Sequence, residues 1–331
     1  MSLAVILSLG LAGGALVGCD DGSPVTDAGP RTDGGGGGTD GGGGGTDSGV
    51  PTGPAVGKGT DVMALNPATY ACNGTEMAPT PGADISWNAV AADFATEGPV
   101  EGLDIQFYPD NAVAVDGTCG GTCQMVTSGA GGVAQVMSPT SGWYGYRIAG
   151  GSGMLNGIPT DFLTVMQFNE EAPDMAGGMR GLTAISATIR DSIVLLLGTS
   201  ANPDRTTVVG TIEDCDGDPI ANVDVRIFGS AGEVLTARSG ADDREFYFNG
   251  GAGGSTVPAQ NRRSTNIDGL YGLANLAVPG DNTYRVEAWG SLTENGPQEL
   301  LGCESIQVAA NSVTIINLGP VRSDGPTDCS N

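Results

Sequence analysis

The chain has 331 residues, with 38 acidic and 13 basic side chains, and its formal net charge is −25. So acidic a chain repels a phosphate backbone, and we expect no nucleic-acid partner. It contains no histidine and a single lysine, Lys58, which excludes serine–histidine and cysteine–histidine catalytic pairs and histidine-bearing zinc sites. Lys58 also lies in no Walker phosphate-binding pattern. We therefore predict a non-enzymatic protein with no cofactor and no metal.

An apolar segment, residues 3–17, opens the chain. It has the length of a signal-peptide core and is too short to span a membrane. It ends in the letters LVGC, which resemble the bacterial lipobox, although no Lys or Arg precedes the segment as in that family. The resemblance implies that residues 1–18 are a lipoprotein signal peptide and that lipid on Cys19 attaches the protein to a membrane of the cell envelope. We rank the outer membrane first; the alternative is a plain secretory signal.

Residues 19–54 consist mainly of Gly, Asp, Thr, Ser and Pro, and the unit TDGGGGG starts at Thr32 and again at Thr39. Such a composition cannot bury a core. It predicts a disordered tether whose root-mean-square span is roughly 33 Å for a Gly-rich coil of this length.

The rest of the chain repeats itself with an offset of 120 residues. The letters PVEGLDI, starting at Pro99, correspond to PIANVDV, starting at Pro219, and YRI at Tyr146 corresponds to YRV at Tyr284. Within both copies apolar residues alternate with polar ones, which is typical of half-buried strands. Short strands separated by turn residues predict an all-β fold of two β-sandwich modules.

The second copy contains GTIEDCDGDPIANVDVRIF and, later, TNIDGLYGLANLAVPGDNTYRVEAWG. These segments resemble the carboxypeptidase regulatory-like domain, a transthyretin-like sandwich, over residues 206–320. Thr265, Asp268, Gly269 and Tyr271 stand at the positions of the family's turn motif. The resemblance implies an accessory or structural module and brings no catalytic residue with it.

The predicted fold class is therefore all-β, with two tandem transthyretin-like or immunoglobulin-like modules after the tether. The first module, with a connecting helix, is expected at 55–205 and the second at 206–321, followed by a polar tail at 322–331. The helix is predicted within 182–197, where apolar residues recur at helical spacing and Thr183 or Ser186 could cap its start. A further strand is the alternative for this segment.

The cysteines predict a disulfide framework. With Cys19 lipidated, an even number remains in an exported chain, so we expect three disulfides. A cysteine metal site is the rival interpretation, but the close pair Cys119 and Cys123 has no second close pair with zinc-ribbon spacing. We expect a bridge between Cys215 and Cys303, with Cys329 as a competing partner. The six candidates are Cys72, Cys119, Cys123, Cys215, Cys303 and Cys329.

Asp214, Asp216 and Asp218 alternate as calcium-loop ligands do. However, Pro219 and Val225 occupy the positions where such a loop needs Gly and a bidentate Glu. We therefore favour a solvated turn over a metal site.

A longer connection in the second copy carries a candidate binding loop, because aromatic and Arg side chains on loops often contact partners. The favoured alternative is that the two phenylalanines pack on the sandwich while the tyrosine faces water. The residues are Arg244, Phe246, Tyr247 and Phe248.

The leading functional hypothesis is a lipid-anchored, non-enzymatic envelope protein whose two modules serve a binding or structural role. The second is a carbohydrate- or peptide-binding accessory subunit of an envelope enzyme system, which an aromatic platform would support. The third is a hydrolase that uses carboxylates alone and needs two carboxyl groups roughly 5 to 9.5 Å apart in a pocket. Expected partners are an envelope protein or a glycan; the sequence does not indicate an oligomeric state.

Overall fold

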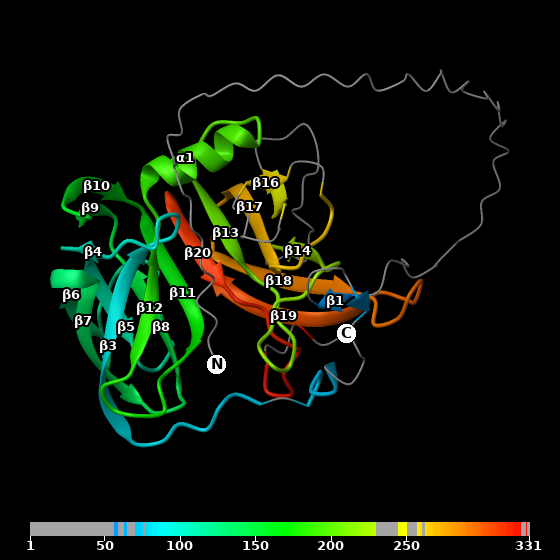
Figure 1. Ribbon diagram of the computed structural model, residues 1–331, viewed down its shortest axis with the longest axis horizontal. Coiled ribbons are helices and arrows are strands. Elements are labelled where there is room, and N and C mark those ends of the chain that lie inside the picture. The colour runs from blue at the N-terminus through cyan, green and yellow to red at the C-terminus, as the bar shows by residue number, and fades with distance from the viewer. Residues whose placement is uncertain are drawn as a thin grey trace, which may run out of the picture. The chain divides into compact units, whose positions relative to one another are not determined.

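The computed structural model describes residues 56–58, 63–64, 70–75, 77–229, 244–249, 257–259, 262–325 and 329. The expected signal peptide, Cys19 and the tether lie outside the described residues. The described part of the chain is all-β and contains one α-helix (Figure 1).

The largest sheet has nine strands in the order β16-β15-β17-β13-β20-β11-β8-β5-β6 (Figure 1). Its strands are β16 (Pro258–Ala259), β15 (Arg244–Phe248), β17 (Leu270–Ala277), β13 (Arg205–Thr211), β20 (Ser312–Ile316), β11 (Thr164–Glu171), β8 (Trp143–Ile148), β5 (Asp104–Tyr108) and β6 (Gln124–Thr127).

Three smaller sheets of three strands and one of two complete the described β-structure. The three-stranded sheets are β12 (Met179–Ala184), β3 (Asp84–Asp93) and β7 (Val133–Pro139); β10 (Ile158–Phe162), β9 (Gly151–Leu155) and β4 (Val100–Glu101); and β14 (Asp224–Phe228), β18 (Thr283–Gly290) and β19 (Glu299–Gln307). The two-stranded sheet pairs β1 (Gly57–Lys58) with β2 (Met63–Ala64).

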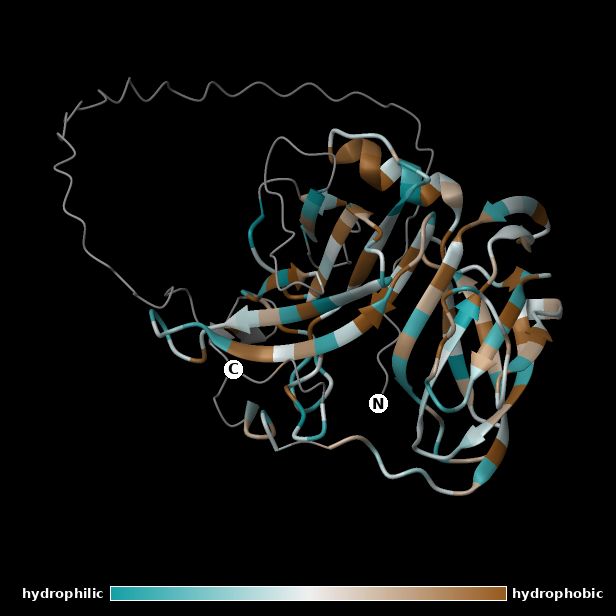
Figure 2. Ribbon diagram, turned by 180° about the vertical axis from the view of Figure 1, so that it is seen from behind, coloured by the Kyte–Doolittle hydropathy of each residue, from teal (hydrophilic) through white to brown (hydrophobic). Residues whose placement is uncertain are grey.

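The first half of the structure, residues 77–200, has its core between sheet β12-β3-β7 and the β11 to β6 part of the large sheet. Trp87 of β3 lies edge-on to Phe107 of β5, with ring centroids 5.5 Å apart, and 5.2 Å from the ring of Tyr144 on β8. Every second side chain of β3 is buried from Trp87 onward. This alternation confirms the expected half-buried strands, and Figure 2 shows apolar and polar residues alternating along the long strands.

The second half, residues 201–325, buries a separate core between sheet β14-β18-β19 and the other end of the large sheet. Tyr247, Tyr271 and Tyr284 are its largest fully buried side chains. Because both halves pair one sheet against another, the chain forms two β-sandwich halves, as expected from the sequence.

The final strand, β20, lies between the two halves. It pairs in parallel with β11 of the first half and with β13 of the second. The large sheet therefore extends through both halves, and β20 is the strand that connects its two parts. We call the three strands β11, β20 and β13 the seam. The module boundaries expected from the sequence stay a prediction.

The segment that precedes the first half packs on the second half. The Val56 amide donates to the Ser291 carbonyl at 2.8 Å, and the Tyr70 side chain is buried in the second core. A disulfide joins Cys72 to Cys215, and the Asn73 side chain donates to the Leu300 carbonyl at 3.2 Å. The first half is thus flanked along the chain by two segments that belong to the second.

The helix α1 spans Ala187–Leu196, and the Ser186 hydroxyl caps it by accepting a hydrogen bond from the Ile189 amide at 3.4 Å. This confirms the expected helix and one of its two cap candidates. The helix starts later than 182, because β12 continues to Ala184 and pairs in parallel with β3. The helix and strand interpretations are thus each correct for one part of the segment. No helix among the described residues is long and apolar enough to cross a membrane.

Candidate functional site

Two carboxyl groups and one amide meet at one end of the seam. Because β11, β20 and β13 run parallel, their carboxyl ends lie at the same edge of the large sheet. Glu170 lies at the end of β11, Asn317 directly follows β20, and Glu213 comes two residues after β13. We call Glu170, Asn317 and Glu213 the acidic seam.

The Asn317 side chain connects the two halves. Its Oδ1 accepts a hydrogen bond from the Thr211 amide at 3.2 Å, and its Nδ2 donates to Glu170 Oε1 at 3.3 Å. Main-chain bonds continue the pairing beyond the strands: the Leu318 amide donates to the Thr211 carbonyl at 2.8 Å, and the Glu213 amide donates to the Leu318 carbonyl at 2.9 Å. The end of the seam is therefore closed by both main-chain and side-chain bonds.

On the first-half side, Glu170 ends a chain of buried hydrogen bonds. The Thr183 amide donates to the Tyr146 hydroxyl at 2.7 Å, that hydroxyl donates to Gln167 Oε1, and Gln167 Nε2 donates to Glu170 Oε1. The pairing of β11 with β8 shifts register between Gln167 and Glu170. Such an irregularity re-aims side chains, and here it contains Asn169, a non-glycine residue with a positive φ of 61°.

Both carboxyl groups of the acidic seam have raised pKa values. Burial raises the pKa of Glu170, and the hydrogen bond from Gln167 and the charge of Arg180 oppose that shift. Burial raises the pKa of Glu213 to about 7, and the negative charges of Glu170, Asp214 and Asp218 add to the shift. Desolvation and like charges both disfavour the ionised form of a carboxyl group.

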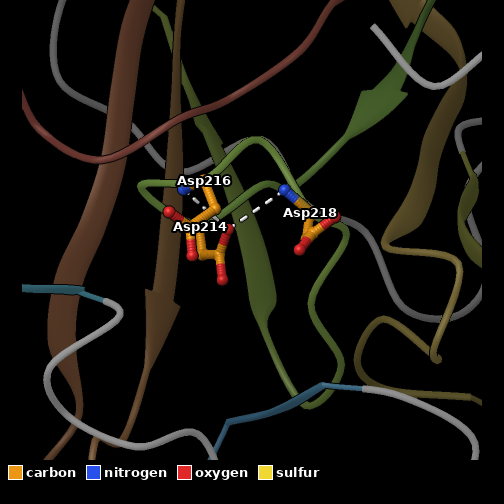
Figure 3. A group of neighbouring side chains, drawn as sticks. All are labelled: Asp214, Asp216 and Asp218. Carbon is orange, nitrogen blue, oxygen red and sulfur yellow. Dashed lines mark hydrogen bonds between the residues drawn. The ribbon is translucent and has the colours of Figure 1, made fainter. Parts of the chain in front are cut away.

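The three aspartates expected to form a turn lie beside this end of the seam (Figure 3). Asp214 is buried, and its Oδ1 accepts hydrogen bonds from the amides of Asp216 and Asp218, each at 3.0 Å. The Asp214 amide donates back to the Asp218 carbonyl at 2.9 Å. One carboxylate oxygen of each residue lies within 4.8 Å of the others. These bonds support a turn, because Asp side chains stabilise turns in this way, but the turn is not solvated throughout: Asp214 is buried and Asp216 is exposed.

The candidate binding loop requires a correction. Phe246, Tyr247 and Phe248 form the end of strand β15, which Arg244 begins, and their side chains are at most 2% exposed. The two phenylalanine rings, 5.5 Å apart, pack with Val194 of α1 and with Leu197, which caps the end of that helix. The three aromatic side chains therefore offer no contact surface.

The expectation that Tyr247 faces water is wrong as well. Its ring lies in the second core, and its hydroxyl accepts from the Val225 amide at 3.0 Å and donates to Glu245 at 2.7 Å. The unbroken aromatic run FYF was the signal for this arrangement, since a strand buried on both faces reads as continuously apolar.

Three disulfides are present, as expected, but the Cys215–Cys303 pairing is wrong. Cys215 pairs with Cys72, with Cα atoms 6.0 Å apart, and Cys303 pairs with Cys329 at 5.8 Å. The third bridge joins Cys119 and Cys123 at 5.4 Å. The partner of Cys215 comes from the segment that packs on the second half, and no local pattern indicated that contact.

A second side-chain contact between the halves involves Arg322, at the start of the expected polar tail. Its guanidinium lies over the ring of Trp143 in the first half, 4.0 Å from the centroid, and pairs with Glu304 of β19 in the second half. Burial raises the pKa of Glu304, while the Arg322 charge opposes the shift. No pattern in the sequence distinguishes this residue, since an Arg in a polar segment carries no signal of burial.

No family model and no curated protein matches the chain. Among solved structures, the chain is similar to the Bacillus anthracis TIE protein, at 13% identity and a TM-score of 0.20, over 71% of this chain and 33% of that one. It thus spans about a third of that protein. It is also similar to the shaft pilin SpaA from Lactobacillus rhamnosus GG, at 13% identity and a TM-score of 0.21, over 72% and 98% of the two chains. It is similar as well to BcpA, the major pilin subunit of Bacillus cereus, at 8% identity and a TM-score of 0.21, over 72% of this chain and 100% of that one. Similarity at this level gives no information about activity or partners.

Proposed function

We propose that this chain is a lipid-anchored, non-enzymatic protein of the cell envelope, which holds two joined β-sandwich halves at the end of a flexible tether for a binding or structural role. The observation that supports the proposal is the fastening of Val56, Tyr70, Cys72 and Asn73 to the second half. The Cys72–Cys215 bridge ties the part of the chain that follows the expected tether covalently to the second half, so an anchor on Cys19 would hold the protein through that half.

The disulfides support export. Three bridges join all six cysteines that lie within the described residues. Bridges of this kind persist in oxidising compartments and are rare in the reducing cytosol. Together with the lipobox-like letters before Cys19, they favour a location outside the cytoplasmic membrane, and we rank the outer membrane first.

Neither alternative function gains support from the described side chains. The accessory-subunit hypothesis needed an aromatic platform, and the candidate aromatics are buried. The carboxylate-hydrolase hypothesis needs two carboxyl groups in a pocket, and its candidate Glu170 already accepts two hydrogen bonds at Oε1, from Gln167 and Asn317. We therefore place the non-enzymatic role first.

The anchor can be tested with Cys19→Ser in the expressing cell. We expect the variant to lose incorporation of labelled fatty acid and to leave the membrane fraction, because the multiple acyl chains expected on Cys19 are needed for stable attachment. The matched control is the double variant Cys119→Ser and Cys123→Ser, which should remain membrane-bound. Retention of Cys19→Ser in the membrane would show instead that residues 3–17 stay in the protein as its anchor. Density separation of the two membranes then tests the outer-membrane assignment.

A further inference from the structure

The methionines of the first half lie on its surface. The chain has nine methionines, and Met179 is the last of them. Among the methionine side chains that the structure describes, Met166 is fully buried and the other six are between 39% and 69% exposed. Methionine is one of the residue types most often found inside proteins, so this distribution is unusual. The six exposed residues are Met77, Met125, Met137, Met154, Met175 and Met179.

Four of the six occupy strand positions that point away from a core. Successive side chains of a strand point to opposite faces, so Met137 on β7 points outward because the neighbouring Val136 lies in the first core. On β6, Met125 points away from the same core, against which Val126 packs. The methionines of β9 and β12 are at exposed positions of the same kind. Core packing therefore does not account for the choice of methionine.

The six side chains do not form one patch. β6 belongs to the large sheet, β7 and β12 to the sheet that faces it across the first core, and β9 to a third sheet. Met125 and Met137 therefore lie on opposite faces of the first half. A docking surface needs contiguous apolar side chains, and a soft-metal site needs thioether sulfurs that converge. The spread favours a role in which each sulfur reacts alone.

The other oxidisable side chains of the described residues are shielded. All seven tyrosines of the chain are buried, none more than 3% exposed, and the six described cysteines are joined in disulfides. Trp87 is buried, and Arg322 lies 4.0 Å from the ring centroid of Trp143. The ring of Trp289 is covered in the same way by Arg226, at 4.7 Å. An oxidant in solution therefore meets the exposed thioether sulfurs first.

We propose that the exposed methionines of the first half are a reversible oxidant sink whose substrates are peroxides. The lone pair of a thioether sulfur attacks one peroxide oxygen, the O–O bond breaks and an S–O bond forms. With hydrogen peroxide the products are methionine sulfoxide and water, so the sulfur is oxidised by two electrons and the peroxide is reduced by two. A sulfoxide reductase reverses the change: two of its thiols are oxidised to a disulfide, and the oxygen leaves as water.

Oxidation at these positions should leave the fold intact. A sulfoxide is polar and disrupts a core, but the six exposed side chains already contact water. Met166 is the contrast, because it is fully buried beside Tyr108 and Val113, where a sulfoxide would break the packing. The sink does not depend on the lipid anchor, since all six sulfurs belong to the first half.

Timed oxidation of the full chain tests the sink. In excess hydrogen peroxide, peptide mass spectrometry should show sulfoxide at the six exposed positions at least about tenfold faster than at Met166. In urea, where the fold is lost, Met166 should react as fast as the others. Once the six are oxidised, the urea midpoint and the three disulfides should be unchanged. The two methionine sulfoxide reductases, one for each sulfoxide epimer, should then restore the original mass.

The sixfold Met→Leu variant at the exposed positions nearly conserves side-chain volume and should lose most of the rapid phase of peroxide consumption. Met166→Leu is the matched control and should keep that phase. Three results would each overturn the proposal: Met166 oxidised in the folded chain as fast as the exposed six, a lower urea midpoint after oxidation, or sulfoxides that the reductases leave in place. If the sixfold variant does not fold, the peptide kinetics of the unaltered chain decide.

Discussion

The guanidinium of Arg322 lies 4.0 Å from the ring centroid of Trp143 and also pairs with Glu304. Trp143 belongs to the first half and Glu304 to the second, so one side chain near the end of the chain holds both. The Arg322 and Glu304 side chains are 15% and 13% exposed. At this depth, loss of one partner leaves the other charge poorly solvated.

We expect Arg322→Ala to lower the free energy of unfolding by about 2 kcal/mol, because it removes a partly buried ion pair and a cation–π contact together. Arg322→Lys should recover part of the loss, since an ammonium keeps the charge without the planar stacking. Urea unfolding measures both. Arg263→Ala, at an exposed arginine, is the control and should stay within about 0.5 kcal/mol. If Arg322→Ala also stays within about 0.5 kcal/mol, the contact of Arg322 with Trp143 and Glu304 contributes nothing to holding the two halves together.

The disulfides should differ in their contributions to stability. The bridges close loops with sequence separations of 143, 26 and 4 residues for Cys72–Cys215, Cys303–Cys329 and Cys119–Cys123. In the chain-entropy model these loops correspond to about 5, 3.5 and 2 kcal/mol, and measured values are often lower. Paired Cys→Ser variants at each bridge, compared by urea unfolding, should therefore rank in that order. Peptide mapping without reductant checks the pairing itself, and a Cys215–Cys303 peptide would contradict the structure.

The part of the fold that follows from local pattern was predictable. Alternation at Trp87 and Ala89 identified half-buried strands, and the spacing of Ile189 and Ile193 identified the helix. The pairing of strands that lie far apart in the chain could not be predicted. The insertion of β20 between β11 and β13 depends on contacts between strands more than a hundred residues apart, and parallel pairing leaves no hairpin signal.

In the candidate site, too, local contacts were predictable and long-range contacts were not. Local turn chemistry around Asp214 was readable because its hydrogen bonds reach only two and four residues along the chain. The acidic seam was not readable, since Glu170 and Asn317 meet only through the seam and lie 147 residues apart. The disulfide pairing failed for a similar reason: the sequence placed Cys215 and Cys303 in one module but gave no indication that Cys72 also packs there.

The Asp214 turn yields a prediction about metal binding. Asp214→Ala removes the acceptor of two amide bonds and should cost about 1 to 2 kcal/mol. Asp216→Ala should cost less than about 0.5 kcal/mol, because the Asp216 side chain is exposed and surface substitutions usually change stability little. We expect millimolar calcium to leave the melting temperature of the unaltered chain unchanged. A calcium-dependent rise that Asp216→Ala abolishes would instead identify the three aspartates as ligands.

Close packing at Gly210 gives the last prediction. Gly210 lies on β13, and the Tyr271 side chain of β17 donates from its hydroxyl to the Ile316 carbonyl of β20 at 2.9 Å. A Cβ atom at Gly210 would collide with that carbonyl oxygen and lie 3.1 Å from the Tyr271 ring. Because the obstacle is main chain, the seam itself would have to widen, and we expect Gly210→Ala to cost at least about 2 kcal/mol.

Gly181→Ala is the matched control, since a Cβ atom at that strand glycine has no neighbour within 4 Å. It should be neutral or stabilise the protein by up to about 1 kcal/mol, because alanine narrows the unfolded ensemble. Tyr271→Phe separates the two effects at the seam: it keeps the ring, removes only the bond to Ile316 and should cost about 1 kcal/mol. Urea unfolding of the three variants gives the comparison. Equal stability of Gly210→Ala and Gly181→Ala would show that β13 and β20 are not packed as closely as the structure places them.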